Sequence, residues 1–532
     1  MIRGALATLL TAAAVWAAPA AAGERASSER EPPQLLPGDT QAASAWAKPG
    51  SWLVGARPDR VSARVADGFG ARRLGHGTAI YQVASSRARA LAAALRARGR
   101  YLFSEPDRLT VRGAFPVDPL SGSQWGLAAV GATLLDPPLV SATSPLLGII
   151  EDGLDPSHPD LQGVAISGAA SGDPEGVVHG TAVTSVASAR ANGVGMTGVW
   201  PGARTLLASA GADCASTVEA LYRAAQAGVA VVNMSYGFSG GCFAHYVATQ
   251  ALFGAGVVLV ASGGNEFLEG NPADSDPAVD PHVITVAALN PDLSSAYFSN
   301  ENNAIDVSAP GSGVLAAVPP ALDGDGVRDG YQAVDGTSFS SPMVAAGTAW
   351  VWQQRPKLHH TQLTDLIRYS AVDLGPRGWD KTFGFGRFDL PTALGAPAPP
   401  PDPLEPNENI SWINGKFFAP DPPIYRGRAT RLSARVDQLE DPFDVYRVII
   451  PGRRSVRIGM RPRFGDLALE AYNPFAKTVL TNRGRIAISD RPGRRLEVLE
   501  IRNPYRSRLK IYVSVFPNTL DAGYQLGLRP SS

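Results

Sequence analysis

Residues 336–342 read Gly-Thr-Ser-Phe-Ser-Ser-Pro, and the apolar segment Met343–Trp352 follows them. A tight glycine turn before an apolar run of this length predicts a helix whose first turn carries Ser338. Backbone N–H groups without partners and a partial positive charge gather at a helix N-terminus, so the Ser338 hydroxyl would lie where an anion is stabilised. The pattern is typical of a serine nucleophile, although an ordinary helix cap would also explain it.

A second segment, His179-Gly180-Thr181-Ala182-Val183, places a histidine where a loop is expected to enter a helix near Gly180–Ala189. A histidine at such a junction can act as the general base for a serine hydroxyl. The chain has 7 histidines, and a single histidine is more often structural, so this segment does not decide the function by itself.

The third segment is the apolar run Leu146–Ile150, which is followed by Glu151 and Asp152. An apolar strand that ends in carboxylates places them at the edge of a parallel sheet where a crevice opens. A carboxylate there can hold a histidine in the productive tautomer and stabilise its cation. Metal binding and simple termination of the strand are the alternatives.

Short β-rich runs alternate with helix-like segments from Gln124 to Leu394. Such alternation predicts an α/β fold with a parallel sheet and helices on both faces. Examples of the runs and segments are Leu146–Ile150, a helix near Gly180–Ala189, Thr205–Ala208, a helix near Val218–Ala227, and Val229–Asn233.

Together these segments resemble the subtilisin-like serine proteases, or subtilases, over nearly all of residues 120–396. The order acid, histidine, serine along the chain is the order of that family. Further segments carry the resemblance between and after the three: residues 193–201, Asn-Met-Ser-Tyr-Gly at 233–237, Val-Ala-Ser-Gly-Gly-Asn at 260–265, 298–300, 309–311 and 383–386. The resemblance implies a subtilisin-like parallel sheet and a serine endopeptidase activity.

The resemblance also implies a role for each matching residue. Ser338 would attack the scissile carbonyl, and His179 would take the serine proton and later protonate the leaving amine. Asn265 would donate a hydrogen bond to the oxyanion, beside the backbone N–H of Ser338. No cofactor and no catalytic metal are expected. The residues expected to bind substrate are Ser235, Tyr236 and Gly237 along its backbone, and Gly263 and Gly264 in the primary specificity pocket.

Two positions depart from the family pattern. Subtilases carry Asp seven residues before the histidine of a His-Pro-Asp-Leu segment, which is residues 158–161 here, and the position seven before is Glu151. Asp152 falls one place late, on the opposite side of an extended chain. Glu151 is therefore the predicted triad acid, and Asp152 is the fallback. The second histidine of the family's His-Gly-Thr-His motif is Ala182 here, and both departures support an alternative function: a catalytically impaired subtilisin-like module that acts in binding or adhesion.

The segment before this domain is expected to be a propeptide, residues 23–115. Within it, residues 51–112 form a small α+β unit that resembles the inhibitory propeptide of subtilases, through the helix Ser86–Arg98 and the segment Phe103–Asp107. The chain is then an autoprocessed proenzyme, cleaved somewhere in residues 112–123, with its own propeptide as intramolecular inhibitor. A permanent structural domain is the alternative.

The segment after the domain begins with a Pro-rich linker at residues 397–403. Short strand-like runs separated by Gly, Pro, Asn and Arg fill residues 404–532, which predicts an all-β sandwich. This tail resembles the pre-peptidase-type β-sandwich domains that follow secreted bacterial proteases. The segments that carry that resemblance are Glu405–Glu408, Asp444–Tyr446 and Asp466–Leu469.

Residues 1–22 have the pattern of a secretory signal: Arg3, an apolar run and Ala20-Ala21-Ala22. A membrane anchor is the alternative, but the run is short for a bilayer. We therefore expect a secreted protein, extracellular or periplasmic, without stable membrane insertion. The two cysteines, Cys214 and Cys242, are then expected to form a disulfide bond.

The charge is balanced overall, with 48 basic and 48 acidic residues, but it is unevenly distributed. The net charge is +7 over residues 1–119, −15 over residues 120–396 and +9 over residues 403–532. This balance argues against a nucleic-acid partner. We expect a monomer that binds protein or peptide substrates and its own propeptide. The acidic loop Asp323–Asp329 suggests structural calcium, but it has few ligands and no closing Glu, so a plain surface loop is favoured and calcium is the alternative.

Overall fold

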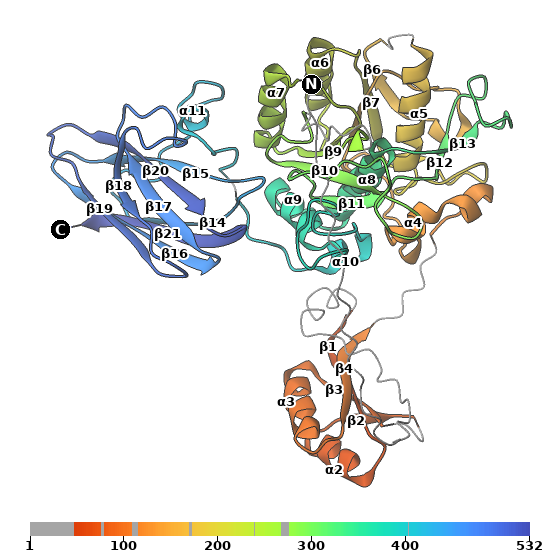
Figure 1. Ribbon diagram of the computed structural model, residues 1–532, viewed down its shortest axis with the longest axis horizontal. Helices are drawn as coiled ribbons and strands as arrows, with labels where there is room; N and C mark the ends of the chain where they lie inside the picture. Colours follow the sequence, from red (N-terminus) through yellow and green to blue (C-terminus); the bar gives the residue numbers. More distant parts are fainter. Residues whose placement is uncertain are drawn as a thin grey trace, which may run out of the picture.

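The computed structural model describes residues 47–75, 79–108, 115–169, 173–238, 240–267, 276–402 and 404–531, and these form three units (Figure 1). The predicted signal, residues 1–22, lies outside the described residues. The leader before residue 47 and part of the predicted cleavage region, residues 112–114, also lie outside them.

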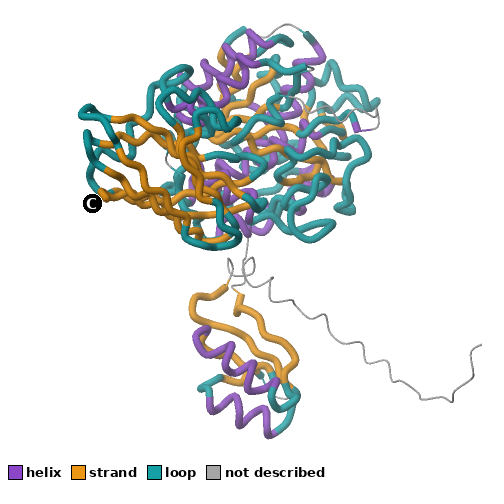
Figure 2. The backbone as a smooth tube through the Cα atoms, turned by 60° about the vertical axis from the view of Figure 1, so that its left-hand side comes forward, coloured by secondary structure: helices purple, strands orange, loops and turns teal. Residues whose placement is uncertain are grey.

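The first unit is a small antiparallel sheet packed against helices. The strand order is β2-β3-β1-β4. Leu91 and Leu95 of the second helix are fully buried and pack with Val54 and Tyr81 of the sheet. The elements are β1 (Ala47–Ala56), α2 (Arg60–Gly68), β2 (Arg72–Leu74), β3 (Ile80–Ala84), α3 (Ser85–Arg96) and β4 (Tyr101–Arg108). Figures 1 and 2 show this unit standing apart below the other two.

The second unit is built on a seven-stranded parallel sheet, as the alternation of strands and helices predicts. The strand order is β11-β10-β9-β8-β5-β7-β6, with every neighbouring pair parallel. The strands are β5 (Leu147–Glu151), β6 (Ala165–Ser167), β7 (Thr205–Ser209), β8 (Val231–Met234), β9 (Val258–Ser262), β10 (Val283–Leu289) and β11 (Val307–Pro310). Because most of these strands are buried on both faces, they are continuous apolar runs rather than alternating ones.

Helices cover both faces of this sheet, which confirms the predicted fold class. Ile149 of β5 packs into the core with α5 (Pro174–Ser188) and α8 (Thr337–Gln354). The next residue, Ile150, points to the opposite face and packs with α6 (Cys214–Gln226) and α7 (Phe243–Gly254). The remaining elements of the unit are η1 (Pro119–Ser123), α4 (Trp125–Ala129), η2 (Ala132–Leu134), η3 (Pro159–Leu161), β12 (Val314–Ala317), β13 (Tyr331–Val334), α9 (His360–Tyr369) and α10 (Leu390–Gly395).

The third unit is two antiparallel four-stranded sheets, with orders β14-β21-β16-β19 and β15-β20-β17-β18. Their inner faces share one apolar core that contains Ile458, Leu469, Val513 and Leu526, so the predicted β-sandwich is confirmed. The elements are α11 (Ile410–Ile413), β14 (Thr430–Asp437), β15 (Asp444–Ile450), β16 (Ser455–Phe464), β17 (Leu467–Tyr472), β18 (Arg485–Ser489), β19 (Glu497–Arg502), β20 (Leu509–Pro517) and β21 (Asp521–Ser531).

A buried ionic contact joins the second and third units. Arg368 of α9 is 2% exposed. Its Nε donates to Oδ1 of Asp306 at 2.7 Å, and its Nη1 donates to Oδ2 of Asp437 at 2.9 Å. Asp437 is the last residue of β14, so the arginine connects the α/β unit to the sandwich.

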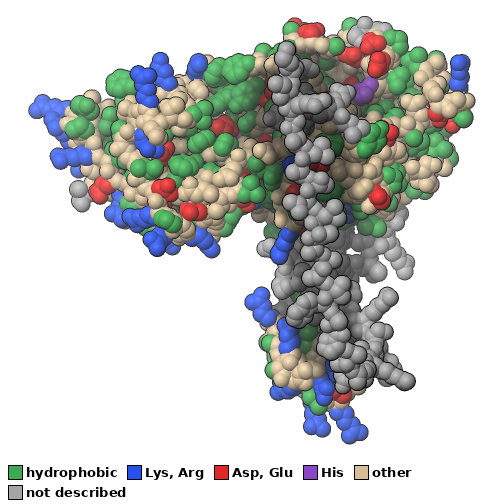
Figure 3. Space-filling view, in the orientation of Figure 1, with side chains coloured by type: hydrophobic (Ala, Val, Ile, Leu, Met, Phe, Trp, Pro, Cys, Tyr) green, Lys and Arg blue, Asp and Glu red, His purple; other side chains and the backbone are tan. Residues whose placement is uncertain are grey.

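The surface charge follows the uneven distribution along the chain. Figure 3 shows Lys and Arg side chains along the edges of the sandwich and around the N-terminal unit. Asp and Glu side chains gather at the upper end of the α/β unit, beside a histidine. The acidic region therefore lies on the unit that carries the candidate site.

Candidate active site

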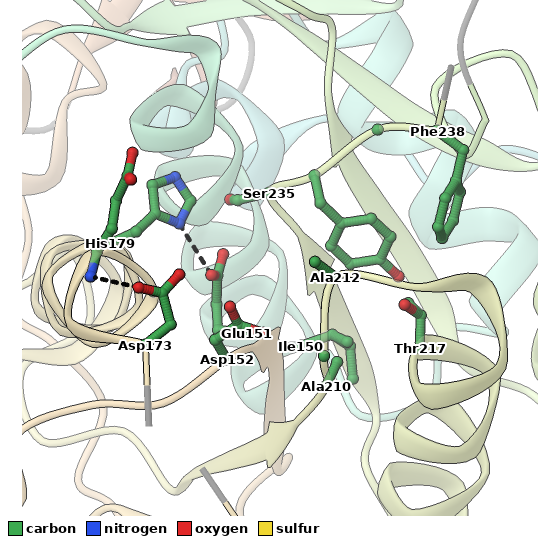
Figure 4. A pocket seen from close by; sticks show the side chains of 15 residues that line it. Ile150, Glu151, Asp152, Asp173, His179, Ala210, Ala212, Thr217, Ser235 and Phe238 are labelled. Carbon is green, nitrogen blue, oxygen red and sulfur yellow. Dashed lines mark hydrogen bonds and ion pairs between the residues drawn. The ribbon is translucent and has the colours of Figure 1, made fainter. Parts of the chain in front are cut away.

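Glu151 is the last residue of β5, a strand that is paired on one side with β7 and on the other with β8. Its position at the carboxyl end of an inner strand is the edge where a parallel sheet opens toward ligands. The residue is 8% exposed. The Nδ1–H of His179 donates to Glu151 Oε2 at 2.8 Å (Figure 4).

His179 comes from α5, whose start is fixed by an Asp cap and a proline. The Asp173 side chain accepts from the backbone N–H of Glu175, and Pro174 occupies the first helical position. Gly180 then lets the helix approach the loop after β5, because a Cβ there would lie 2.0 Å from the backbone oxygen of Gly153. This close approach brings His179 to Glu151.

The pKa of His179 is the balance of burial and nearby carboxylates. Burial lowers it, whereas the charge and hydrogen bond of Glu151 raise it, followed by the charges of Asp152 and Glu175. The net pKa lies above the ordinary histidine value of 6.5. A proton on this imidazole is therefore stabilised, as the general base of an acyl transfer requires.

Ser338 lies in the first turn of α8, as the sequence predicts, and is 9% exposed. Its Oγ donates to the backbone oxygen of Ser235 at 3.4 Å, and the Ser235 hydroxyl donates to the backbone oxygen of Ser338 at 2.8 Å. The ring of the next residue, Phe339, lies 5.7 Å from the ring of His179. Within the described part of the chain, no hydrogen bond joins the Ser338 hydroxyl to the imidazole; such bonds often form only when substrate is present.

Asn265 lies just after β9, beside the turn that precedes Ser338. Its Oδ1 accepts hydrogen bonds from the backbone N–H and the hydroxyl of Thr337, both at 2.9 Å. The backbone N–H of Gly264 donates to the same hydroxyl at 3.1 Å. Because these bonds occupy Oδ1, the amide nitrogen of Asn265 is the group left to donate toward a ligand at the start of α8.

A cavity of about 370 Å³ opens on one side of His179 (Figure 4). Ser235, Tyr236 and Gly237 line it, whereas Gly263 and Gly264 do not. Three acidic residues also line the cavity: Asp152, Asp173 and Glu175. Asp152 is predicted only as the fallback acid, and the other two belong to no predicted site. The only signal for the last two in the sequence is their position four to six residues before His179.

In the acidic loop considered for calcium, carboxylates accept hydrogen bonds from backbone N–H groups of the same segment. Asp323 Oδ2 accepts from the N–H of Gly330, and Asp325 Oδ1 accepts from the N–H of Val327. Among the described residues, the groups of side chains close enough to hold a metal ion lie elsewhere, at the junction with the sandwich. They are His282, Glu405 and Glu408, and Asp402, Glu405, Asp441 and Asp444.

The predicted disulfide is present between Cys214 and Cys242. Cys214 begins α6 and Cys242 caps α7, so the bond ties together two neighbouring helices on one face of the sheet. The two cysteines are 28 positions apart, so closing this loop is worth about 3.6 kcal/mol in the unfolded-chain entropy model. Within the described residues, no helix has both the length and the apolar character that crossing a membrane requires.

The fold and this site define an α/β protein that holds a histidine–carboxylate pair at the carboxyl edge of a parallel sheet, with a serine in the first turn of a helix that packs against the histidine's helix. The model of the subtilase family matches residues 142–386. Subtilisin DY of Bacillus licheniformis is 31% identical over 238 residues, which are 43% of this chain and 84% of that protein. The chain belongs to the subtilase family.

Fervidolysin of Fervidobacterium pennivorans is 32% identical over 321 residues, which are 53% of this chain. The match spans only 45% of fervidolysin itself. A crystal structure of fervidolysin, described as a keratinolytic enzyme related to subtilisin, covers 85% of each chain with 18% identity and a TM-score of 0.47.

Proposed function

We propose that this chain is a serine endopeptidase that hydrolyses peptide bonds through an acyl-enzyme. The observation that carries the proposal is the 2.8 Å hydrogen bond between Glu151 and His179, on a helix that packs against the helix of Ser338. A carboxylate bound to Nδ1 fixes the tautomer in which Nε2 is free to take a proton. Membership of the subtilase family supports the same reaction.

In the proposed reaction, Ser338 Oγ attacks the carbonyl carbon of the scissile bond while His179 Nε2 takes the hydroxyl proton. The carbonyl oxygen becomes an oxyanion, which accepts hydrogen bonds from the Asn265 amide and the Ser338 backbone N–H. His179 then gives its proton to the leaving amine, and the C–N bond breaks. Water attacks the resulting ester by the same route, which restores the serine. No step requires a metal ion or an organic cofactor.

The rival function, an impaired module that only binds, arises from the replacement of Asp by Glu at position 151. The hydrogen bond to His179 supports the enzymatic function instead, because the side chain of Glu151, although longer than that of Asp, still reaches the imidazole. Asp152, the fallback acid, makes no hydrogen bond to His179 among the described residues. We propose Glu151 as the triad acid.

Replacing Ser338 with Ala tests the function directly. We expect Ser338→Ala to abolish casein hydrolysis and labelling by a fluorophosphonate probe. Ser340→Ala is the matched control, because Ser340 is fully buried in the same helix turn and its hydroxyl has no partner among the described groups. Casein hydrolysis by Ser338→Ala at the parent rate, or folded parent protein that the probe does not label, would refute the proposal.

We also propose that the N-terminal unit is a removable inhibitor and that residues 1–22 direct export. The support is the resemblance of the unit to subtilase propeptides and the contrast between its +7 segment and the −15 domain. N-terminal sequencing of the exported product, with and without Ser338→Ala, tests both steps. We expect a start within residues 112–123 for the parent and a start near residue 23 for the variant. The same start for both proteins would rule out autoprocessing.

A further inference from the structure

The cavity beside His179 combines an acidic end with an apolar wall. Asp152 follows β5, and Asp173 and Glu175 stand at the start of α5. The cavity is also lined by the apolar and aromatic residues Ile150, Ala210, Ala212, Tyr236 and Phe238. Figure 4 shows the acidic side chains on the His179 side and the aromatic rings on the other. Among the described residues that line the cavity, none is lysine or arginine.

The carboxylate of Asp152 is held at the cavity without a cation. It lies against Gly176, where a Cβ would come within 2.5 Å of Asp152 Oδ2, so only glycine leaves room for it. In the part of the chain that the structure describes, no hydrogen bond or ion pair reaches this carboxylate. Burial raises the pKa of Asp152, the charge of Asp173 raises it further, and the charge of His179 offsets part of the rise.

A second observation at the same cavity indicates a missing donor. Glu151 uses Oε2 for His179, but its Oε1 is buried and has no hydrogen-bond partner among the described groups. The side chain is 93% buried and lines the cavity. A buried carboxylate oxygen without a partner is costly, so a donor that enters from the cavity would be stabilised there.

The apolar wall suits a long side chain with a charged end. Tyr236 and Phe238 pack edge to face with ring centroids 5.7 Å apart, and Tyr236 is fixed by a 2.9 Å hydrogen bond between its hydroxyl and His245. A methylene stem can lie along such rings while its cationic end reaches carboxylates. A norleucine side chain would make the contacts with the apolar wall but none with the carboxylates. The carboxylates would repel an acidic side chain.

We propose that this cavity is a specificity subsite that binds a lysine or arginine side chain of the substrate, at a position close to the scissile bond. The proposal rests on the endopeptidase function above and names the substrate class of that site. Asp152 and Asp173 are the specificity-determining residues, with Glu175 at the exposed rim.

Sets of fluorogenic peptides test the proposal on the mature enzyme. Each set varies one position near the scissile bond through lysine, arginine, norleucine and glutamate. We expect one position at which lysine or arginine exceeds norleucine in kcat/KM by about tenfold or more, the size of a charge-assisted hydrogen bond in a partly exposed site. Glutamate should be the poorest residue there, and the preference should shrink as salt rises.

Asp152→Asn and Asp173→Asn remove the charge while keeping the shape, and Asn still caps α5. We expect each variant to bring the ratio of lysine to norleucine toward one at that position. Glu219→Gln is the control, because Glu219 is a 75% exposed acid of the same unit that does not line the cavity. It should keep the parent ratio.

The outcomes separate the subsite from the reaction. Cleavage with no basic preference at any position, or a preference that both Asn variants keep, would overturn the subsite and leave the endopeptidase function standing. No cleavage of any peptide together with no fluorophosphonate labelling would overturn the function and the subsite together.

Discussion

Shortening the acid at position 151 is a sensitive test of the site, because the side chain just reaches its partner. One C–C bond is about 1.5 Å long, so the 2.8 Å separation between the carboxylate and His179 Nδ1 would open to about 4.3 Å in Glu151→Asp. That distance is beyond the roughly 3.2 Å limit of an N–H···O hydrogen bond. Asp at this position would therefore lose the bond unless the backbone moved.

The backbone around Glu151 has little freedom to move. Strand β5 is hydrogen-bonded on both sides, and Glu151 itself pairs with Ser209 of β7. The helix cannot approach further, because Gly180 already brings α5 to the loop after β5. The loss is then that of a charge-assisted hydrogen bond, about 1.5–3 kcal/mol, which corresponds to roughly 10- to 150-fold in kcat/KM.

The measurement is kcat/KM with one peptide substrate, at a pH where His179 is neutral, for a series of variants. Glu151→Gln should lose about 10⁴-fold, because the amide favours the wrong tautomer of the imidazole. Asp152→Asn removes the same charge one residue later and should lose at least a hundredfold less than Glu151→Gln. Thermal unfolding of each variant shows whether it is folded.

Two results would refute this reasoning. Parent activity in Glu151→Asp would show that the carboxylate does not act through the 2.8 Å bond. A larger loss in Asp152→Asn than in Glu151→Gln would move the triad acid to Asp152.

Three further predictions concern the base, the oxyanion and the junction between units. Nearby carboxylates raise the pKa of His179 above 6.5, and the base must be neutral to take a proton. The midpoint of the acidic limb of the pH profile, where kcat/KM falls as His179 is protonated, should therefore lie above pH 6.5. Asp152→Asn should move the limb to lower pH, and a limb that stays or moves upward would contradict the assignment. Asn265→Ala should lower kcat by about 10²–10³-fold with little change in KM, and an unchanged kcat would exclude Asn265 as oxyanion donor. Arg368→Met should lower the free energy of unfolding by about 3–5 kcal/mol, because the carboxylates of Asp306 and Asp437 would stay buried without a cation. Thermal unfolding measures this loss, and an unchanged midpoint would show that the contact adds no stability.

The sequence predicts the sheet and the position of the acid for physical reasons that are local. Each inner strand is a short apolar run, and polar residues follow where the strand ends. Because parallel strands end at one edge of the sheet, a carboxylate that directly follows the run Leu146–Ile150 is expected at the crevice there. The period of an extended chain also favours Glu151 over Asp152, since neighbouring side chains point to opposite sides.

The acidic wall of the cavity could not be predicted in this way. Asp152 and Asp173 are separated along the chain by η3 and β6, and the close approach of α5 at Gly176 and Gly180 brings them together. The close approach depends on these two glycines. Their sequence positions do not show that they lie against the loop after β5, which becomes clear only from the position of α5 in the fold. The sequence of residues 323–329 leaves both calcium and a plain surface loop open, because repeated Asp and Gly are typical both of ion loops and of turns whose carboxylates cap their own backbone.

Glu151 is the main cause of the raised pKa of His179, but the carboxylates of the proposed subsite raise it further, and this couples the base to the subsite. The carboxylates of Asp152 and Glu175 stabilise the proton on His179 and would also stabilise a cationic side chain in the cavity. A bound lysine partly neutralises those carboxylates, so it must lower the pKa of His179. Coupling of this kind is reciprocal: a proton on His179 must weaken the binding of lysine by the same factor. The acidic limb of kcat, which reports the enzyme with substrate bound, should therefore lie at lower pH for a lysine peptide than for its norleucine analogue. If the subsite held the side chain by apolar contact alone, the acidic limbs of kcat for the lysine and norleucine peptides would have the same midpoint pH.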